Sequence, residues 1–132
     1  MELIEWTSAF IDNLNFFRHD LIQKEMKEKE IICQYKNKGE LKYIVEAELN
    51  KGILEKIKNG NLVLVCLNSK ENLLFMINNW EDLIKNSRLK VIFSNPGLNL
   101  QWSLIPYTHN MISDNGSLKL GLKGLFESVP SV

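Results

Sequence analysis

The chain has 132 residues, of which 45% are hydrophobic and 24% are charged, and this balance excludes a disordered chain. Sixteen basic and sixteen acidic residues give a formal net charge of zero, which excludes the strongly basic surface of a non-specific nucleic-acid binder. The length fits one folding unit. Residues 1–132 are therefore predicted to form a single globular domain with no nucleic-acid partner.

The cysteines and the N-terminal residues bear on the compartment in which the chain works. Cys33 and Cys66 lie in apolar, strand-like runs, which favours buried, reduced thiols and predicts a cytoplasmic location. Glu2 and Glu5 stand where a secretory signal would carry lysine or arginine, so no signal peptide is expected. No run of about 18 apolar residues occurs, so neither a membrane span nor a membrane partner is expected.

An amphipathic helix is predicted over residues 3–26. Apolar residues recur there at spacings of three and four, which is the stripe of a helix with 3.6 residues per turn. The residues of the stripe are Trp6, Phe10, Leu14, Phe17 and Leu21. The highly charged stretch from Lys24 to Glu30 is expected to end this helix in solvent.

A β-hairpin is predicted over residues 30–49. Its strands, 31–35 and 41–45, are rich in β-branched and aromatic residues, and Gly39 supplies the turn between them. Apolar and polar residues partly alternate along the second strand as far as residue 49, so one of its faces is expected to be buried. A short helix is predicted over residues 51–59.

The middle of the chain predicts a βαβ unit. Residues 62–67 are continuously apolar, which favours a central strand covered on both faces. Residues 70–86 carry the apolar spacing of a long helix, and residues 89–93 form the next strand. Two strands joined by a helix of this length are expected to be parallel, with a right-handed crossover.

The last third of the chain begins with a break at Asn95-Pro96-Gly97. An extended piece is predicted around residues 102–105, and a final helix over residues 117–129. The element order is thus α-β-β-(α)-β-α-β-(β)-α. It predicts an α/β fold, bordering on α+β, in which helices pack on a single-layer mixed β-sheet.

One segment stands apart in composition: Val91 to Ser113 contains no charged residue. It starts at the carboxyl end of a predicted parallel strand, where open α/β sheets bind ligands. One interpretation is an aromatic and amide surface over residues 94–112 that docks a ligand or a protein. The other is a long connection over the core, whose amides bond its own backbone. The candidate binding residues are Asn95, Trp102, Tyr107, His109 and Asn110.

His109 is also the best candidate for acid–base chemistry, because an unperturbed histidine titrates near neutral pH. However, no serine, cysteine or carboxylate stands at a recognisable spacing from it, and an active site requires such a constellation. A structural role is therefore favoured, and no catalytic residue is assigned. Metal and cofactor binding are not expected either, since the two histidines and two cysteines lack zinc spacing and no phosphate-binding glycine loop occurs.

Glu46 and Glu48 give an alternative, because carboxylates at positions i and i+2 of a strand share a face and can share a divalent metal. The order helix, three strands, helix, strand resembles the core of the PD-(D/E)XK nucleases, which implies metal-dependent hydrolysis. Those nucleases use an acidic residue followed by an E-x-K pair on the next strand. The strand 62–67 carries neither, and Glu46-Ala-Glu48 lacks the lysine, so any such site would be degenerate.

The element order also resembles that of small secretion chaperones, which are dimers that wrap extended partner segments. The main prediction is accordingly a non-enzymatic module that binds a protein, peptide or ligand through residues 94–112. Homodimerisation through that segment or a sheet edge is the related prediction. The alternative is a divalent-metal-dependent hydrolase that uses Glu46 and Glu48.

Overall fold

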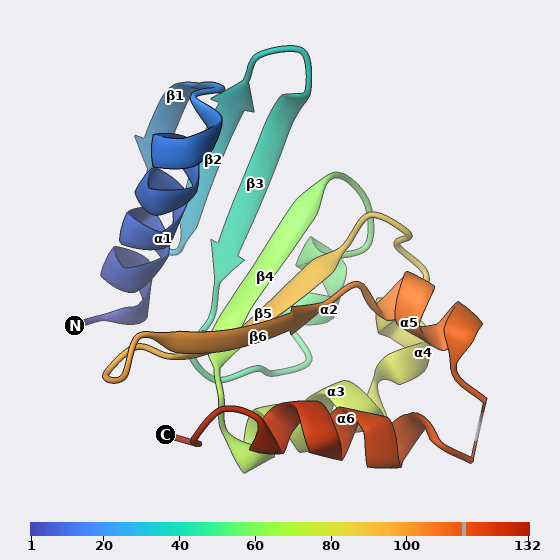
Figure 1. Cartoon of the computed structure of the whole chain (residues 1–132). Coiled ribbons are helices and arrows are strands. Elements are labelled where there is room, and N and C mark those ends of the chain that lie inside the picture. Colours follow the sequence, from blue (N-terminus) through green and yellow to red (C-terminus); the bar gives the residue numbers. More distant parts are fainter. Residues whose placement is uncertain (115) are drawn as a thin grey trace.

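The computed structural model describes residues 1–114 and 116–132. It shows an α/β fold in which six strands form one mixed sheet with helices on both faces (Figure 1). The strands are β1 (Leu21–Met26), β2 (Glu30–Tyr35), β3 (Gly39–Val45), β4 (Leu62–Leu67), β5 (Lys90–Asn95) and β6 (Leu100–Leu104). The helices are α1 (Leu3–Arg18), α2 (Ile53–Lys56), α3 (Lys70–Asn78), α4 (Trp80–Leu83), α5 (Pro106–Ile112) and α6 (Leu118–Glu127).

The strands lie in the sheet in the same order as in the chain, β1-β2-β3-β4-β5-β6. The pairs β1–β2, β2–β3 and β5–β6 are antiparallel, whereas β3–β4 and β4–β5 are parallel. The parallel βαβ unit predicted around residues 62–93 is thus confirmed. The hairpin is confirmed as well, although β3 ends at Val45, before the predicted limit of residue 49.

The sheet separates two apolar cores, and β4 belongs to both. Leu62, Leu64 and Cys66 face the large core, which α2, α3, α4 and α6 cover. Val63 and Val65 face the small core under α1. This alternation explains the continuous apolar run, because a strand covered on both faces gains nothing from polar side chains on either.

The prediction of one helix over residues 3–26 was wrong. Helix α1 ends at Arg18, where His19 adopts a left-handed conformation (φ 54°), and β1 begins at Leu21. The left-handed residue closes the last turn, with its N–H donating to the carbonyl of Asn15, and directs the following residues out of the helix. The stripe therefore mixed two elements, and Phe17 at its end is exposed.

The helix predicted over residues 70–86 is divided in two at Asn79. The Asn79 side chain donates a hydrogen bond to the carbonyl of Phe75 (2.8 Å), which caps α3 before α4 begins at Trp80. Ser69 caps the other end of α3, because its Oγ accepts from the backbone N–H of Asn72 (3.2 Å).

Buried asparagines hold the loops at the ends of the strands. The Asn72 side chain donates to the carbonyls of Ala47 and Leu67 (2.8 Å each) and accepts from the N–H of Leu49 (2.9 Å). Asn86 donates to two carbonyls of the loop between α2 and β4. Backbone groups that leave a sheet need such partners when they are buried.

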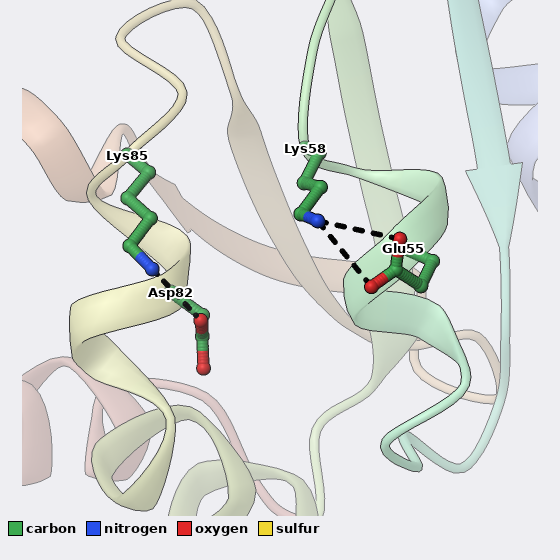
Figure 2. A network of polar contacts seen from close by, with 4 residues as sticks. All are labelled: Glu55, Lys58, Asp82 and Lys85. Atoms are coloured by element: carbon green, nitrogen blue, oxygen red, sulfur yellow. Dashed lines mark hydrogen bonds and ion pairs between the residues drawn. The ribbon is translucent and has the colours of Figure 1, made fainter.

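The short helices α2 and α4 each carry one ion pair on their solvent side (Figure 2). Lys58 lies 3.4 Å from Glu55, and Lys85 lies 3.4 Å from Asp82. All four side chains are largely exposed, so each pair adds little to stability. Each pair stays within its own stretch of chain, and we assign it no role in a binding site.

Cys33 and Cys66 are free thiols, and both are buried, as the sequence predicts. Among the described residues, no helix has the length and the apolar character that crossing a membrane requires.

Candidate functional site

The uncharged segment forms one border of the sheet. It runs from the end of β5 through a turn at residues 96–99, along β6 and into α5 (Figure 1). The extended piece predicted at residues 102–105 is thus an ordered strand that begins two residues earlier. Helix α5 was not predicted, although Pro106 at its first position is a common signal for a helix start.

Trp102 lies in the large core and is only 6% exposed. Its ring stacks on its cross-strand neighbour Phe93, with ring centroids 4.3 Å apart. Its Nε1 donates a hydrogen bond to Oδ1 of Asn68 (2.7 Å). This side chain therefore stabilises the fold from inside, and a contact surface built on this segment must use other residues.

Two of the candidate amides bond within the chain. Asn95 is buried; its Nδ2 donates to the carbonyl of Pro130 (3.0 Å), and its Oδ1 accepts from the N–H of Leu98 (3.3 Å). Asn110 accepts a hydrogen bond from Nε1 of Trp80 (2.9 Å). These contacts correspond to the interpretation in which the amides of the segment bond their own chain.

His109 lies between α4 and α6. Its ring meets the ring of Trp80 edge to face, with centroids 6.1 Å apart. Its Nε2 is buried and has no hydrogen-bond partner among the described residues. In the same part of the chain, no serine, cysteine or carboxylate is hydrogen-bonded to the ring, so the geometry assembles no acid–base pair around His109.

Tyr107 differs from the other candidates because its side chain is 41% exposed. We group it with the other exposed apolar residues of β6 and α5 and call this group the α5–β6 surface. Its members are Leu100, Ile105, Tyr107, Met111 and Ile112, all exposed by 40% or more. Met111 and Ile112 are 70% and 79% exposed, and sequence reasoning missed them because α5 itself was missed.

A shallow cavity of about 330 Å³ lies beside this surface. Ile105 and Ile112 line it from the two ends of α5, and Ser103 and Leu104 line it from β6. Lys90 is the charged residue on its wall, and burial together with the nearby Arg18 lowers the pKa of this lysine. The cavity is therefore mainly apolar and continues the α5–β6 surface onto the edge of the sheet.

The two edges of the sheet differ in chemistry. Edge strand β1 carries Lys24 and Glu25, and its register shifts between Leu21 and Gln23. Charges and irregular register are the usual protection of a sheet edge against further pairing. Edge strand β6 reads Leu-Gln-Trp-Ser-Leu, with no charge and an unbroken register against β5. Within the described residues, β6 pairs with no strand other than β5.

Glu46 directly follows the last residue of β3, and Glu48 lies in the bend after it, so the two do not share a regular strand face. The strand alternation that predicted their common face therefore does not apply. Glu46 is paired with Lys29 (3.3 Å), whereas Glu48 is exposed. Among the residues that the structure describes, no group of three histidine, cysteine, aspartate or glutamate side chains is placed to hold a metal ion.

Strand β3 also carries an E-x-K spacing that was not predicted as a site, at Glu40 and Lys42. Lys42 lies 3.7 Å from Glu30 of β2, and Glu40 accepts a hydrogen bond from Gln34 (3.0 Å). However, Glu30 is opposite Ile44 in the register, so the two carboxylates lie four positions apart, which is roughly 13 Å along a strand. They do not converge on one ion.

Burial raises the pKa of the Cys33 and Cys66 thiols, so both stay protonated at neutral pH and neither is an activated nucleophile. Comparisons of the chain with protein-family models, with curated proteins and with solved structures gave no match.

Proposed function

We propose that this chain is a non-enzymatic docking module that binds an extended segment of a protein partner along β6. The observation that carries the proposal is the difference between the two sheet edges. Strand β1 is charged and irregular, whereas β6 is uncharged and regular. An open edge strand presents alternate N–H and C=O groups, and an added strand satisfies them with main-chain hydrogen bonds.

The α5–β6 surface supports this proposal because it supplies apolar contacts beside the open edge. Ile105 and Tyr107 stand directly after β6, and Met111 follows one helical turn later. Burial of such side chains contributes about 25 cal/mol per Å² of apolar surface, while the main-chain bonds set the direction of the partner strand. A partner segment with alternating apolar residues would fit this site.

A second copy of the chain is one partner that the sequence of β6 admits. The strand is nearly symmetric about Trp102 in its pattern of apolar and polar residues. An antiparallel pair of β6 strands centred there would place Leu100 opposite Leu104 and Gln101 opposite Ser103. Apolar residues would then continue on one face, which is the condition for a stable register.

The compartment forms part of the same proposal. The two free thiols are buried and form no disulfide, which fits a reducing environment. We therefore assign the docking module to the cytoplasm.

The test places one lysine on each sheet edge. Gln101 on β6 and Gln23 on β1 are both exposed, so Gln101→Lys and Gln23→Lys are matched substitutions. Complexes are captured by cross-linking in extract of the source cells, and hydrogen exchange then locates the protected amides. We expect protection of the β6 amides in the complex, and loss of the complex in Gln101→Lys but not in Gln23→Lys.

Light scattering of the purified protein separates the two kinds of partner. A dimer that Gln101→Lys dissociates identifies the second copy, and a monomer that gains β6 protection in extract identifies a different protein. A complex that forms with the β6 amides still exchanging freely would overturn the proposal. Equal loss of the complex in both lysine variants would do the same.

A further inference from the structure

A small pocket with charged and polar side chains in its lining lies at the end of α1, and the proposed function does not use it. Its volume is about 90 Å³. It is bounded by the end of α1, the turn between β2 and β3, and the residue before β4. The polar side chains that line it are Arg18, Asp20, Tyr35, Lys38, Tyr43 and Asn61.

Asp20 is half satisfied in this pocket. Its Oδ2 pairs with Nζ of Lys38 (3.1 Å). Its Oδ1 is buried, yet no donor among the described residues bonds it. A buried carboxylate oxygen without a donor is costly, so this atom marks a place where a ligand can supply a proton donor.

Arg18, in contrast, supplies hydrogen-bond donors that have no anionic partner among the described residues. Its guanidinium makes no ion pair with any carboxylate that the structure describes, although Asp20 lines the same pocket. A guanidinium only donates, and its planar fork matches two oxygens of one anion. The lining side chains Arg18, Lys38 and Asp20 together leave one positive charge, which favours an anionic ligand.

These needs define the ligand: a small anion that accepts from Arg18 and also carries its own donor for Asp20. One water molecule needs about 10–15 Å³ of such a cavity, so the pocket has room for roughly six to nine waters, and a ligand of a few non-hydrogen atoms fits it. Burial raises the pKa of Tyr35 and raises that of Tyr43 to about 12, so both phenols keep their protons at neutral pH.

We propose that this pocket binds a protonated phosphate group, with inorganic phosphate as the ligand that its size admits. Arg18 would hold two phosphate oxygens, and Lys38 would add a point charge. Asp20 Oδ1 would accept the hydrogen bond of a P–OH group. A carboxylate at this position rejects an anion that has no proton, because two acceptors would then face each other without a hydrogen.

Sulfate provides the sharpest comparison, because it has the shape of phosphate but no proton at neutral pH. The probes are sodium phosphate and sodium sulfate at equal ionic strength, and binding to the full chain is measured by calorimetry at pH 7. We expect sulfate to bind at least ten-fold more weakly than phosphate. Asp20→Asn should narrow this difference, since its amide can donate to sulfate.

The source of the phosphate group is distinguished with methyl phosphate. A phosphate monoester loses its second proton near pH 6, whereas inorganic phosphate keeps one P–OH through neutral pH. Methyl phosphate should therefore bind at pH 5.5 and weaken ten-fold or more at pH 8, while inorganic phosphate still binds. Equal affinity for both at pH 8 would assign the site to monoesters without a role for the proton, and would contradict the assignment of Asp20.

The two arginines of the chain give the control. Arg18→Gln should weaken phosphate binding at least ten-fold, while Arg88→Gln, an exposed arginine outside the pocket, should leave it unchanged. Equal binding of phosphate and sulfate by the wild-type chain would overturn the proposal, whether or not the Asp20 variant folds. So would equal effects of the two arginine variants. These outcomes are independent of partner docking at β6.

Discussion

Asn68 has no exposed surface, and its side chain is bonded at both ends. Its Oδ1 accepts from Trp102, and its Nδ2 donates to the carbonyl of Val129 (3.0 Å). The side-chain amide of Asn68 thus connects the end of β4, the indole ring of Trp102 on β6 and the segment after α6. At the scale of single residues, buried amides of this kind decide how the sheet and the C-terminal segment fit together.

The Asn68→Ala substitution should therefore be severe. It leaves the indole N–H of Trp102 and the carbonyl of Val129 buried without partners, which costs about 3 kcal/mol of unfolding free energy. Asn78→Ala on the exposed side of α3 is the matched control and should change the stability by less than about 0.5 kcal/mol. Urea denaturation measures the stability of both variants. Similar midpoints would contradict the conclusion that the hydrogen bonds of Asn68 stabilise the fold.

Residue chemistry alone did not separate the core from the surface in the uncharged segment. Trp102 and Tyr107 are five positions apart and similar in character, yet one is buried and the other is exposed. Trp102 is buried because its face of β6, which the register with β5 sets, points into the large core, whereas Tyr107 lies on the exposed side of α5.

At the scale of elements, a strand or helix was predicted correctly where its apolar pattern fits only one kind of element. Residues 62–67 are apolar on both faces, and β4 occupies those six positions. β1 was missed because Leu21 continues the helical spacing of α1, although a left-handed His19 had already ended the helix. α5 was missed because a helix of seven residues is too short to show a stripe.

The end of α1 allows a direct test of that explanation. His19 holds a positive φ of 54°, a conformation that favours glycine over any residue with a Cβ atom. His19→Gly should raise the unfolding free energy by about 0.5 kcal/mol, after the greater chain entropy of glycine is subtracted. His19→Val should lower it by at least about 1 kcal/mol. Denaturation midpoints in the reverse order would show that the left-handed turn does not limit the stability of this corner.

At the scale of the whole molecule, the carboxylates Glu30, Glu40 and Glu46 are spread along the sheet rather than gathered at one point. Glu46 forms an ion pair with Lys29 after the end of β3. Glu30 lies on β2 and Glu40 lies on β3, four register positions apart. The described residues bring no three metal-binding side chains together. The metal-dependent hydrolase that would use Glu46 and Glu48 stays an alternative prediction, and added metal tests it.

Added metal should accordingly leave the protein unchanged. Millimolar MgCl₂ or MnCl₂ is expected to shift the Tm by no more than the same ionic strength of KCl, because selective binding to the folded state would be needed to raise it. Differential scanning fluorimetry measures this. A rise in Tm that disappears in Glu46→Ala but persists in the exposed control Glu55→Ala would instead establish the carboxylate site.

The strand order of the sheet also determines how the molecule can be assembled. Each strand pairs with the strand that precedes it in the chain (Figure 1). Short loops connect the three antiparallel pairs, and helices lie in the connections of the two parallel pairs. Local pairing of this kind speeds folding and lets a nascent chain add one strand at a time during synthesis. The hydrogen bond between Asn68 and Val129 joins residues 61 positions apart, so it forms only after the C-terminal segment has been synthesised. Before this contact forms, the apolar residues of the large core are exposed to water, and exposed apolar surface is what chaperones bind.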